Sequence, residues 1–260
     1  MPAIEIRDMT ADDEAFVGPC THIDEAEEWT ASGKRRATWL RAMHAKGART
    51  KVALLDGAHA GFLHCMPIEH APWGPLGRDL MVVPCLAVKD DVKGRGVGSA
   101  LLAAAEDETR RQGLKGLVTT GWYHDFWFMP GPWFERRGFT VVARQDTRAI
   151  LWKVYDPTAE PPGFLKRNWE FVPVEGKVAV DLFWMCFCLT SDSEAQRVRE
   201  VAAEFGNKVV LREYSRDDQE AFMRHQTGRA IFVNGKEIGW GYEAPREGVR
   251  EAIDDALRKA

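Results

Sequence analysis

The sequence lacks the segments that would place a protein in a membrane or send it across one. None of its apolar runs approaches the length of a membrane span. The acidic start, Met1-Pro2-Ala3-Ile4-Glu5, lacks the positive charge followed by an apolar run that marks a signal peptide. These absences predict a cytoplasmic protein with no membrane partner.

Cysteine and clustered basic charge are also scarce. The five cysteines are an odd number scattered through a long chain, unlike a disulfide scaffold, so we expect reduced thiols. The net charge is -4 and no strong basic cluster is present, so we expect no nucleic-acid partner. What is present, 45% hydrophobic and 28% charged residues, is typical of a globular protein, and 260 residues favour two domains.

The most informative stretch is a glycine-rich loop between an apolar run and an alanine-rich helical pattern. The loop is Lys93-Gly94-Arg95-Gly96-Val97-Gly98-Ser99, and a helix is expected from 98 to 112. Glycine permits positive φ and close approach to a ligand, and the first turn of a helix presents unpaired N–H groups. Phosphate suits such a loop. Because a plain turn can have the same pattern, the neighbouring segments must decide.

The preceding run, residues 80–88, is almost continuously apolar, which is typical of a strand buried on both faces. Pro84 interrupts it. Because proline has no N–H to donate, it predicts a bulge or a parting of the strand from its neighbour. Nearby N–H groups would then be free to bind a ligand.

The remaining first half predicts an α/β arrangement. We expect a strand over 4–7, a helix that begins at 10–13, a second helix over 32–45, and a hairpin of strands 51–55 and 60–66. After the glycine loop and its helix we expect a strand over 117–120, an aromatic loop that runs into a short helix over 122–139, and a hairpin of strands 141–144 and 149–152.

This order resembles the GNAT family of N-acetyltransferases over residues 3 to 153, and two motifs carry the resemblance. In that family an apolar strand is followed by Arg or Gln, two residues, Gly, one residue, and Gly or Ala. Lys93, Gly96 and Gly98 take those places here, and Lys93 keeps a cation. Phe134-Glu135-Arg136-Arg137-Gly138-Phe139 resembles the closing signature of an aromatic residue, three residues and Gly-Phe.

The resemblance implies a mixed sheet flanked by helices and transfer of an acetyl group from acetyl-CoA to an amine. It implies that backbone groups of Leu86, Ala87 and Val88 pair with the pantetheine arm and that the loop from Lys93 to Ser99 holds the pyrophosphate. A backbone N–H near Leu86 would polarise the acyl carbonyl, where negative charge develops.

The residues that would donate and accept protons differ from those common in the family. Family members commonly carry a tyrosine four residues before the closing glycine, but Phe134 stands there. Tyr123 or His124 could replace it, or coenzyme A could leave as a thiolate that water protonates. Glu69, His70 and His124 are candidate bases, although each is also explained as an ordinary solvated side chain.

The aromatic run over 122–134 is explained by core packing at least as well as by a substrate pocket. If it lines a pocket, the substrate would be an apolar or aromatic amine rather than a polycation. The predicted partners are therefore acetyl-CoA and a small-molecule amine, with a homodimer as a further option.

The proline-rich segment 156–177 predicts a linker between a domain over 1–155 and a second over 178–260. After it we expect a strand over 179–185, a helix starting at the box Ser191-Asp192-Ser193-Glu194, a strand over 209–211, a helix over 217–224, a hairpin over 230–238 and a helix over 245–257.

This second half resembles a small thioredoxin-like α/β domain, and the whole chain resembles bacterial YoaP-type proteins. The cysteine pair of that fold is missing at the expected helix start, so we expect a redox-inactive module that shapes substrate access or a dimer. Cys186 and Cys188 are predicted to be buried structural thiols.

Two rivals to an N-acetyltransferase remain. One is a thiol or metal-binding protein, with soft ligands from Cys20-Thr21-His22, His64-Cys65 and Cys186-Phe187-Cys188, although structural metal sites usually have longer spacings. The other is a non-catalytic acyl-CoA sensor, with which Phe134 is consistent.

Overall fold

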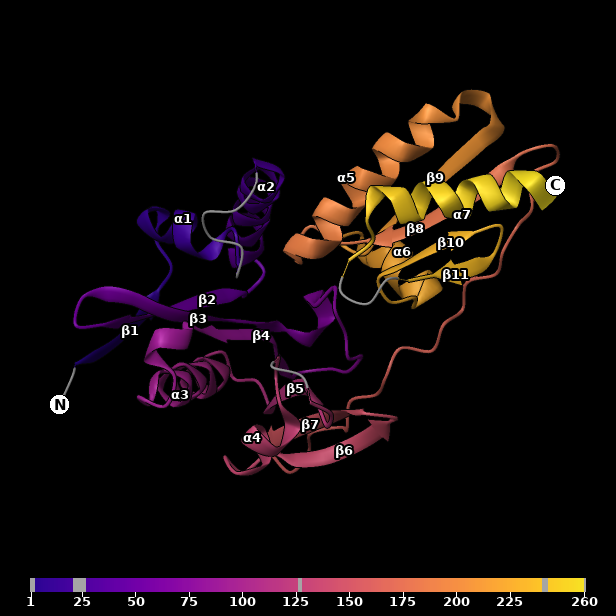
Figure 1. Ribbon diagram of the computed structural model, residues 1–260. Coiled ribbons are helices and arrows are strands. Elements are labelled where there is room, and N and C mark those ends of the chain that lie inside the picture. The colour runs from indigo at the N-terminus through magenta and orange to yellow at the C-terminus, as the bar shows by residue number, and fades with distance from the viewer. Residues whose placement is uncertain (1–2, 21–26, 126–127, 240–242, 260) are drawn as a thin grey trace. The chain divides into compact units, whose positions relative to one another are not determined.

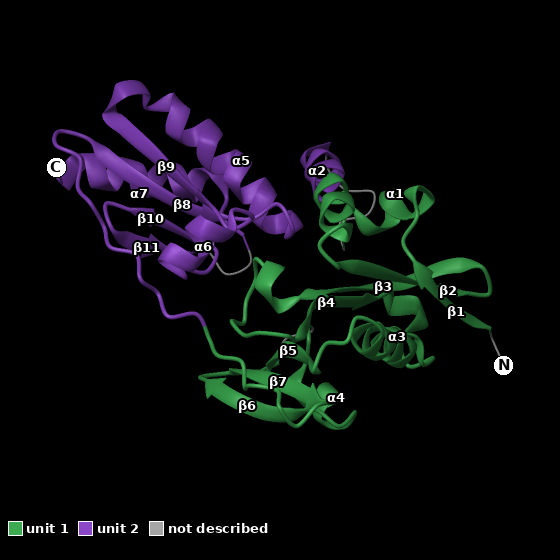
Figure 2. Cartoon of the chain, turned by 180° about the vertical axis from the view of Figure 1, so that it is seen from behind, with its two compact units in different colours: residues 1–23, 37–164 green, residues 24–36, 165–260 purple. Residues whose placement is uncertain are grey.

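A computed structural model describes residues 3–20, 27–125, 128–239 and 243–259. The chain divides into two compact units (Figure 2). The first is Met1–Ile23 with Ala37–Phe164, and the second is Asp24–Arg36 with Leu165–Ala260. Residues 155–177, all of them described, form no helix or strand. The domain limits drawn from the sequence stay a prediction.

The first unit is built on a seven-stranded mixed sheet in the order β1-β2-β3-β4-β5-β7-β6 (Figure 1). All neighbours are antiparallel except β4 and β5, which are parallel. The strands are β1 (Ile4–Asp8), β2 (Arg49–Leu55), β3 (Ala58–Pro67), β4 (Met81–Val88), β5 (Gly116–Trp122), β6 (Thr140–Gln145) and β7 (Arg148–Val154).

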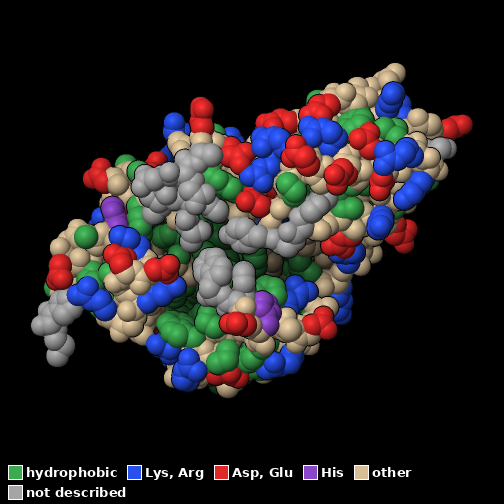
Figure 3. Space-filling model, in the orientation of Figure 1, with side chains coloured by type: hydrophobic (Ala, Val, Ile, Leu, Met, Phe, Trp, Pro, Cys, Tyr) green, Lys and Arg blue, Asp and Glu red, His purple; other side chains and the backbone are tan. Residues whose placement is uncertain are grey.

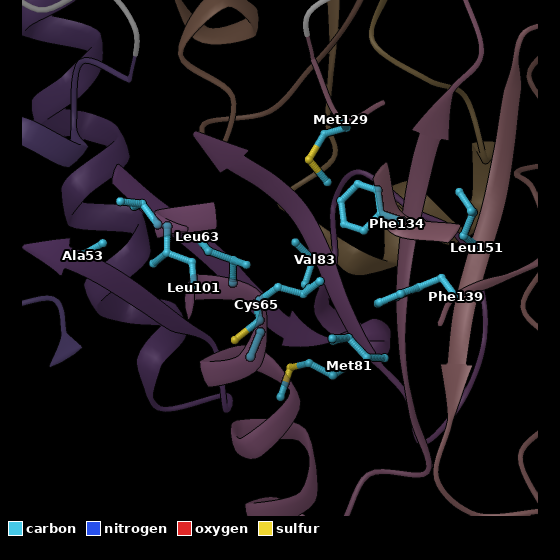
Figure 4. Close-up of a cluster of buried hydrophobic side chains, with 14 of the residues drawn as sticks. Ala53, Leu63, Cys65, Met81, Val83, Leu101, Met129, Phe134, Phe139 and Leu151 are labelled. Carbon is cyan, nitrogen blue, oxygen red and sulfur yellow. The ribbon is translucent and has the colours of Figure 1, made fainter. Parts of the chain in front are cut away.

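Helices cover both faces of this sheet. Figure 1 shows α1 (Glu14–Val17) on one side and α3 (Val97–Arg111) on the other. Within α3, the buried residues recur every three or four positions, namely Val97, Leu101, Leu102, Ala105 and Thr109, so one face packs on the core. Figure 4 shows Leu101 with Leu63 and Cys65 of β3 in that core. Helix α2 (Glu27–His44) contributes residues to both units and begins before the expected position 32.

The second unit has a four-stranded sheet in the order β11-β10-β8-β9. Its elements are β8 (Val178–Trp184), α5 (Leu189–Glu204), β9 (Val209–Ser215), α6 (Gln219–His225), β10 (Ala230–Val233), β11 (Lys236–Ile238) and α7 (Arg246–Lys259). Strands β8 and β9 are parallel, whereas β10 pairs antiparallel with both β8 and β11. The predicted α/β fold class, with a large mixed sheet and a second small sheet, is confirmed.

The expected start of α5 at Ser191 is wrong. The backbone N–H of Asp192 donates to the carbonyl of Cys188 at 3.0 Å, so the helix begins at Leu189. The Ser191 hydroxyl instead accepts the N–H of Met185 at 3.1 Å, which fixes the chain entering the helix. A serine that resembles a cap thus lies inside the first turn.

On the face that Figure 3 shows, basic and acidic side chains are interspersed. Among the described residues, no helix is long and apolar enough to cross a bilayer.

A buried carboxylate joins the first strands to the segment that leads into α1. Asp13 accepts a hydrogen bond from Arg7 Nη2 at 2.8 Å and one from the N–H of Thr10 at 2.7 Å, and His59 Nε2 lies 2.8 Å from its Oδ1. Burial alone would raise the pKa of Asp13, but the hydrogen bonds from Arg7, Thr10 and His59 outweigh it and hold that pKa well below its usual range.

We therefore expect Asp13→Asn to lower the free energy of unfolding by about 1–3 kcal/mol, because it leaves Arg7 without its charged partner. A carboxyl whose folded pKa is depressed stabilises fully above its unfolded pKa of about 4, and that stabilisation is lost as the pH falls further. In urea unfolding the gap to wild type should stay constant from about pH 7 to 5 and shrink below about pH 4.

Asp12→Asn is the matched control, because Asp12 is the exposed neighbour of Asp13. It should change the free energy of unfolding by less than about 0.5 kcal/mol. Equal effects of the two substitutions would contradict the role given to Asp13.

Candidate functional site

Strand β4 stays beside β5 for only its first three residues. Residues 81–83 pair in parallel with 117–119, and the pairing ends at Pro84. The register with β3 on the other side shifts between His64 and Met66, opposite the same point. Thr119 Oγ1 donates to the carbonyl of Val83 at 2.8 Å, where the two strands part. The parting predicted from Pro84 is confirmed.

Beyond Pro84, β4 has one free edge. The Ala87 carbonyl oxygen lies 2.6 Å from the point where a Cβ on Gly61 of β3 would lie, so Ala87 directs its backbone groups toward β3. Because these groups alternate along a strand, Leu86 and Val88 direct theirs to the opposite side. No strand in the described parts of the chain pairs there. An extended ligand could use this edge as a strand.

Ala87 is consequently a correction to the predicted site. From the sequence we predicted that Ala87 pairs with the ligand together with Leu86 and Val88, but the backbone N–H and C=O of Ala87 face β3. The bulge at Pro84 decides this, because one extra residue reverses which backbone groups point outward.

The glycine loop that follows ends at an uncapped helix. Gly94 and Gly96 have φ of 79° and 89°, a region that other residues adopt at a cost. Gly96 is the N-cap residue of α3 and offers no side chain to the N–H groups of Val97, Gly98 and Ser99. Those donors and the positive end of the helix dipole form a site suited to an anion.

Two exposed cations flank this loop. Lys93 Nζ lies 2.5 Å from Asp90 Oδ1, and Arg95 Nη2 lies 4.0 Å from Asp56 Oδ2. Exposed pairs of this kind contribute about 0–1 kcal/mol, so both cations can turn to an anionic ligand at little cost.

Helix α4 (Gly131–Glu135) and the residues after it cover the first turn of α3. A Cβ on Gly98 would lie 3.3 Å from Trp133 and 3.6 Å from Val88, so these side chains meet at the loop. The Arg137 guanidinium stacks 3.6 Å from the Trp133 ring centre, and its Nη2 donates to Ser99 Oγ at 2.9 Å.

A cavity of about 520 Å³ adjoins this contact and is lined by residues that include Ser99, Glu106, Arg136, Arg137 and Lys153. The uncapped helix start and this cavity share Ser99, and Val88 of the open strand edge lies beside Gly98 in the same helix turn. An extended ligand that carries phosphate groups would fit this arrangement.

Tyr123 lies on the loop after β5 and against the start of α4. A Cβ on Gly131 would lie 2.4 Å from its ring, and the Arg144 guanidinium lies 3.9 Å from the ring centre. The hydroxyl is buried beside the Glu135 carboxylate. Burial and the nearby Glu135 raise the pKa of Tyr123, so at neutral pH the hydroxyl keeps its proton and can only donate it.

The other candidate acids and bases are not all near the open edge. His124 is exposed, and its ring meets Trp122 edge to face at 5.5 Å. Glu69 accepts the N–H of Asp79 at 2.7 Å, just before β4 begins. Five strand residues, about 17 Å, separate that end of β4 from Leu86. The structure therefore places Glu69 near the start of β4, and His70 follows it in the chain.

Phe134 is a core residue. It is 1% exposed and lies near Met129, Val83 and Leu151 in the same cluster (Figure 4). Around it Trp122, Tyr123, Phe128 and Trp133 are partly buried, while Phe126 and Trp127 lie outside the described residues. The aromatic run thus packs on the core from one side and keeps part of its surface exposed.

The metal-binding alternative gains no support. In the ranges that the structure covers, no three His, Cys, Asp or Glu residues are grouped to hold an ion, and Thr21 and His22 lie outside those ranges. Cys65 is buried, and burial raises the pKa of its thiol to about 12. Cys186 and Cys188 are half-buried rather than fully buried as predicted, because they lie in the turn between β8 and α5.

Comparison with known proteins gives the class. Residues 11–125 match the model of the acetyltransferase (GNAT) family. The first unit is therefore a GNAT acetyltransferase domain, and the predicted enzyme class, an acyltransferase, is confirmed. No curated protein matches the chain.

Solved structures similar to this chain include a protein assigned to the GNAT family from Desulfovibrio desulfuricans, 20% identical, with a TM-score of 0.46 over 58% of this chain and 99% of its own. A protein from Salmonella typhimurium, described as an acetyltransferase with its cofactor acetyl-CoA, is 20% identical with a TM-score of 0.47 over 61% and 98%. The PaiA N-acetyltransferase of Thermoplasma acidophilum, in complex with coenzyme A, is 16% identical with a TM-score of 0.45 over 59% and 99%.

Gly96 and Gly98 differ in backbone conformation, because Gly96 has a positive φ and Gly98 lies inside α3. Gly96→Ala should lower the free energy of unfolding by about 1–2 kcal/mol, because it forces a side chain into the left-handed region. Gly98 lies inside α3, where alanine gains up to about 1 kcal/mol in helix propensity and loses part of it against Trp133. Urea unfolding should therefore rank Gly98→Ala as the more stable variant, and the reverse order would contradict this loop conformation.

Proposed function

We propose that the chain transfers the acetyl group of acetyl-CoA directly to the amino group of a small molecule. The observation that carries this proposal is the free edge of β4 at Leu86 and Val88, continuous with the uncapped N-terminus of α3. GNAT enzymes use acetyl-CoA as cosubstrate, and the family match covers this segment.

The residues present suit the parts of the coenzyme. Leu86 and Val88 offer backbone donors and acceptors to its amide-bearing arm. The N–H groups of Val97, Gly98 and Ser99 suit the diphosphate, with Lys93 and Arg95 as mobile counter-charges. Arg136 and Arg137 supply positive charge to the adjoining cavity, whereas Lys153 is paired there with Glu106. When bound, acetyl-CoA supplies an activated thioester.

The chain then has three tasks at the thioester. The Leu86 N–H is the donor we assign to the acyl oxygen, because a fixed donor has its largest effect where negative charge develops. Tyr123 keeps its proton at neutral pH and is the group we assign to protonate the leaving thiolate. His124 is the remaining candidate base for the ammonium substrate, whereas the position of Glu69 argues against it.

The partly exposed aromatic rings of the run support an apolar or aromatic amine as acceptor. An aromatic surface gains more from covering an apolar ring than from a solvated polycation.

For the second unit we propose a thioredoxin-like module of the YoaP type. Parallel β8 and β9, antiparallel β10 and β11, and helices after β8, β9 and β11 support this topology. A domain over 1–155, a linker over 156–177, a module over 178–260, a cytoplasmic location and a homodimer belong to the same proposal.

An acyl-CoA sensor is the second candidate, because Phe134 fills the core and provides no hydroxyl. Saturable acetyl-CoA binding without turnover of any amine in a broad panel would favour the sensor over the enzyme.

Calorimetric titration with acetyl-CoA should show saturable binding that Gly98→Glu abolishes, because the new carboxylate would face the diphosphate and displace Trp133. Gly113→Glu is the matched control. It adds the same charge beyond the opposite end of α3, at a position with φ +68° and no atom within 4 Å of an added Cβ. Binding that survives Gly98→Glu, or is lost equally in Gly113→Glu, would exclude the proposed cradle.

With an amine that supports turnover, Tyr123→Phe should lower kcat by about 10- to 100-fold and leave KM for acetyl-CoA nearly unchanged, because only the proton donor is removed. Tyr155→Phe is the control, since its hydroxyl is also buried but packs under Arg110 at the other end of α3. An unchanged kcat in Tyr123→Phe would assign thiolate protonation to water.

A further inference from the structure

The carboxyl ends of β8 and β9 bring two chain segments together in the second unit. These strands are parallel and in register to their last residues, Trp184 and Ser215. The N–H of Arg216 donates to the carbonyl of Trp184 at 2.8 Å, and the N–H of Cys186 donates to Asp217 Oδ2 at 2.7 Å. Ligand sites in α/β sheets commonly lie at this edge.

Arg216 is buried at this edge beside Asp217, whose carboxylate interacts with it electrostatically. The residue is 4% exposed, and its Nε and Nη2 make no hydrogen bond in the described structure. The carbon of its guanidinium lies 4.7 Å from the centre of the Phe222 ring. Burial lowers the pKa of Arg216 to about 9, because the neighbouring Asp217 carboxylate offsets only part of the desolvation.

Nε and Nη2 are the pair of donors that this unit uses elsewhere to hold carboxylates. Arg197, Arg199, Arg212, Arg229 and Arg250 each direct the same two atoms to both oxygens of an Asp or Glu. Such a planar fork matches a carboxylate in geometry and charge. On Arg216 the same two atoms make no hydrogen bond in the described structure.

The start of α5 and the thiol of Cys188 lie near Arg216. Cys188 is the N-cap residue of α5, and no side chain caps the N–H groups of Leu189, Thr190 and Ser191. The Cys188 thiol is half-buried, contacts Thr190 Oγ1 at 3.1 Å and interacts electrostatically with Arg216. Two carboxyl oxygens nearby, Asp217 Oδ1 and Asp192 Oδ1, are also buried and unpartnered and could accept N–H or O–H groups of a ligand.

We propose that the second unit binds a small carboxylate-bearing molecule, with the carboxylate on Nε and Nη2 of Arg216 and the rest of the ligand beside Cys188 at the start of α5. This site is separate from the acetyl-CoA cradle and does not depend on the proposed acetyl transfer.

Iodoacetate tests the proposal because it carries both a carboxylate and a thiol-reactive carbon. The Cys188 sulfur forms an S–C bond to that carbon while the C–I bond breaks and iodide leaves; neutral iodoacetamide reacts in the same way without the carboxylate. The probe is selective, because burial raises the pKa of neighbouring Cys186 to about 12 and leaves it unreactive.

The rates at individual cysteines, measured by mass spectrometry of peptides from the full chain, should give a ratio of iodoacetate to iodoacetamide at Cys188 about tenfold above that at half-buried Cys20. Arg216→Met should lower the Cys188 ratio to the Cys20 value. Arg199→Met, which removes an arginine already paired with Glu213, should leave the ratio high.

Arg216→Lys keeps the charge but not the fork and should lose most of the preference. Acetate should protect Cys188 of the wild type, and chloride at the same concentration should not. The proposal is overturned if Cys188 shows no preference for iodoacetate, if Arg216→Lys retains the full preference, or if inorganic phosphate protects better than acetate.

Discussion

The hydrogen bonds that β4 does not make beyond Pro84 determine the candidate site of the first unit. The ladder to β5 ends at Val83, so the backbone groups of Leu86 and Val88 face away from β3, where no strand of the described structure pairs with them. Unpaired backbone groups are costly when buried, so such an edge persists only where solvent or a ligand satisfies it. Because the glycine loop follows directly in the chain, the same few residues also deliver an uncapped helix start to that edge.

The packing of Phe134 and Trp133 bears on which residue could donate a proton to the leaving thiolate. Phe134 is committed to the core, and the adjacent Trp133, clamped by Arg137, reaches the first turn of α3. In our proposal the proton donor therefore comes from the loop before α4, where Tyr123 lies with its buried hydroxyl beside Glu135. The hydroxyl that family members place on the helix is thus replaced, in our proposal, by one on the adjoining loop.

In the second unit, Arg216 differs from the other arginines in how its guanidinium is hydrogen-bonded. Five of its arginines place their forks on acidic side chains, so their charges are compensated. Arg216 keeps the same fork buried and unpartnered within the described chain. Asp217 offsets only part of the cost of burying this charge, so a bound anion would explain the two unused donors more readily than stability does.

The sequence by itself determined the features that depend on local chemistry. Pro84 cannot donate to a ladder, and glycine alone tolerates the φ of residue 96, so the parted strand and the loop could be predicted, as could the order of elements in both units. Only the tertiary structure decided which backbone groups face outward, because one bulge residue turned Ala87 toward β3. It also placed Glu69 near the start of β4, started α5 at Leu189 and left Nε and Nη2 of Arg216 without a hydrogen bond in the described structure, since each of these depends on packing that the sequence does not show.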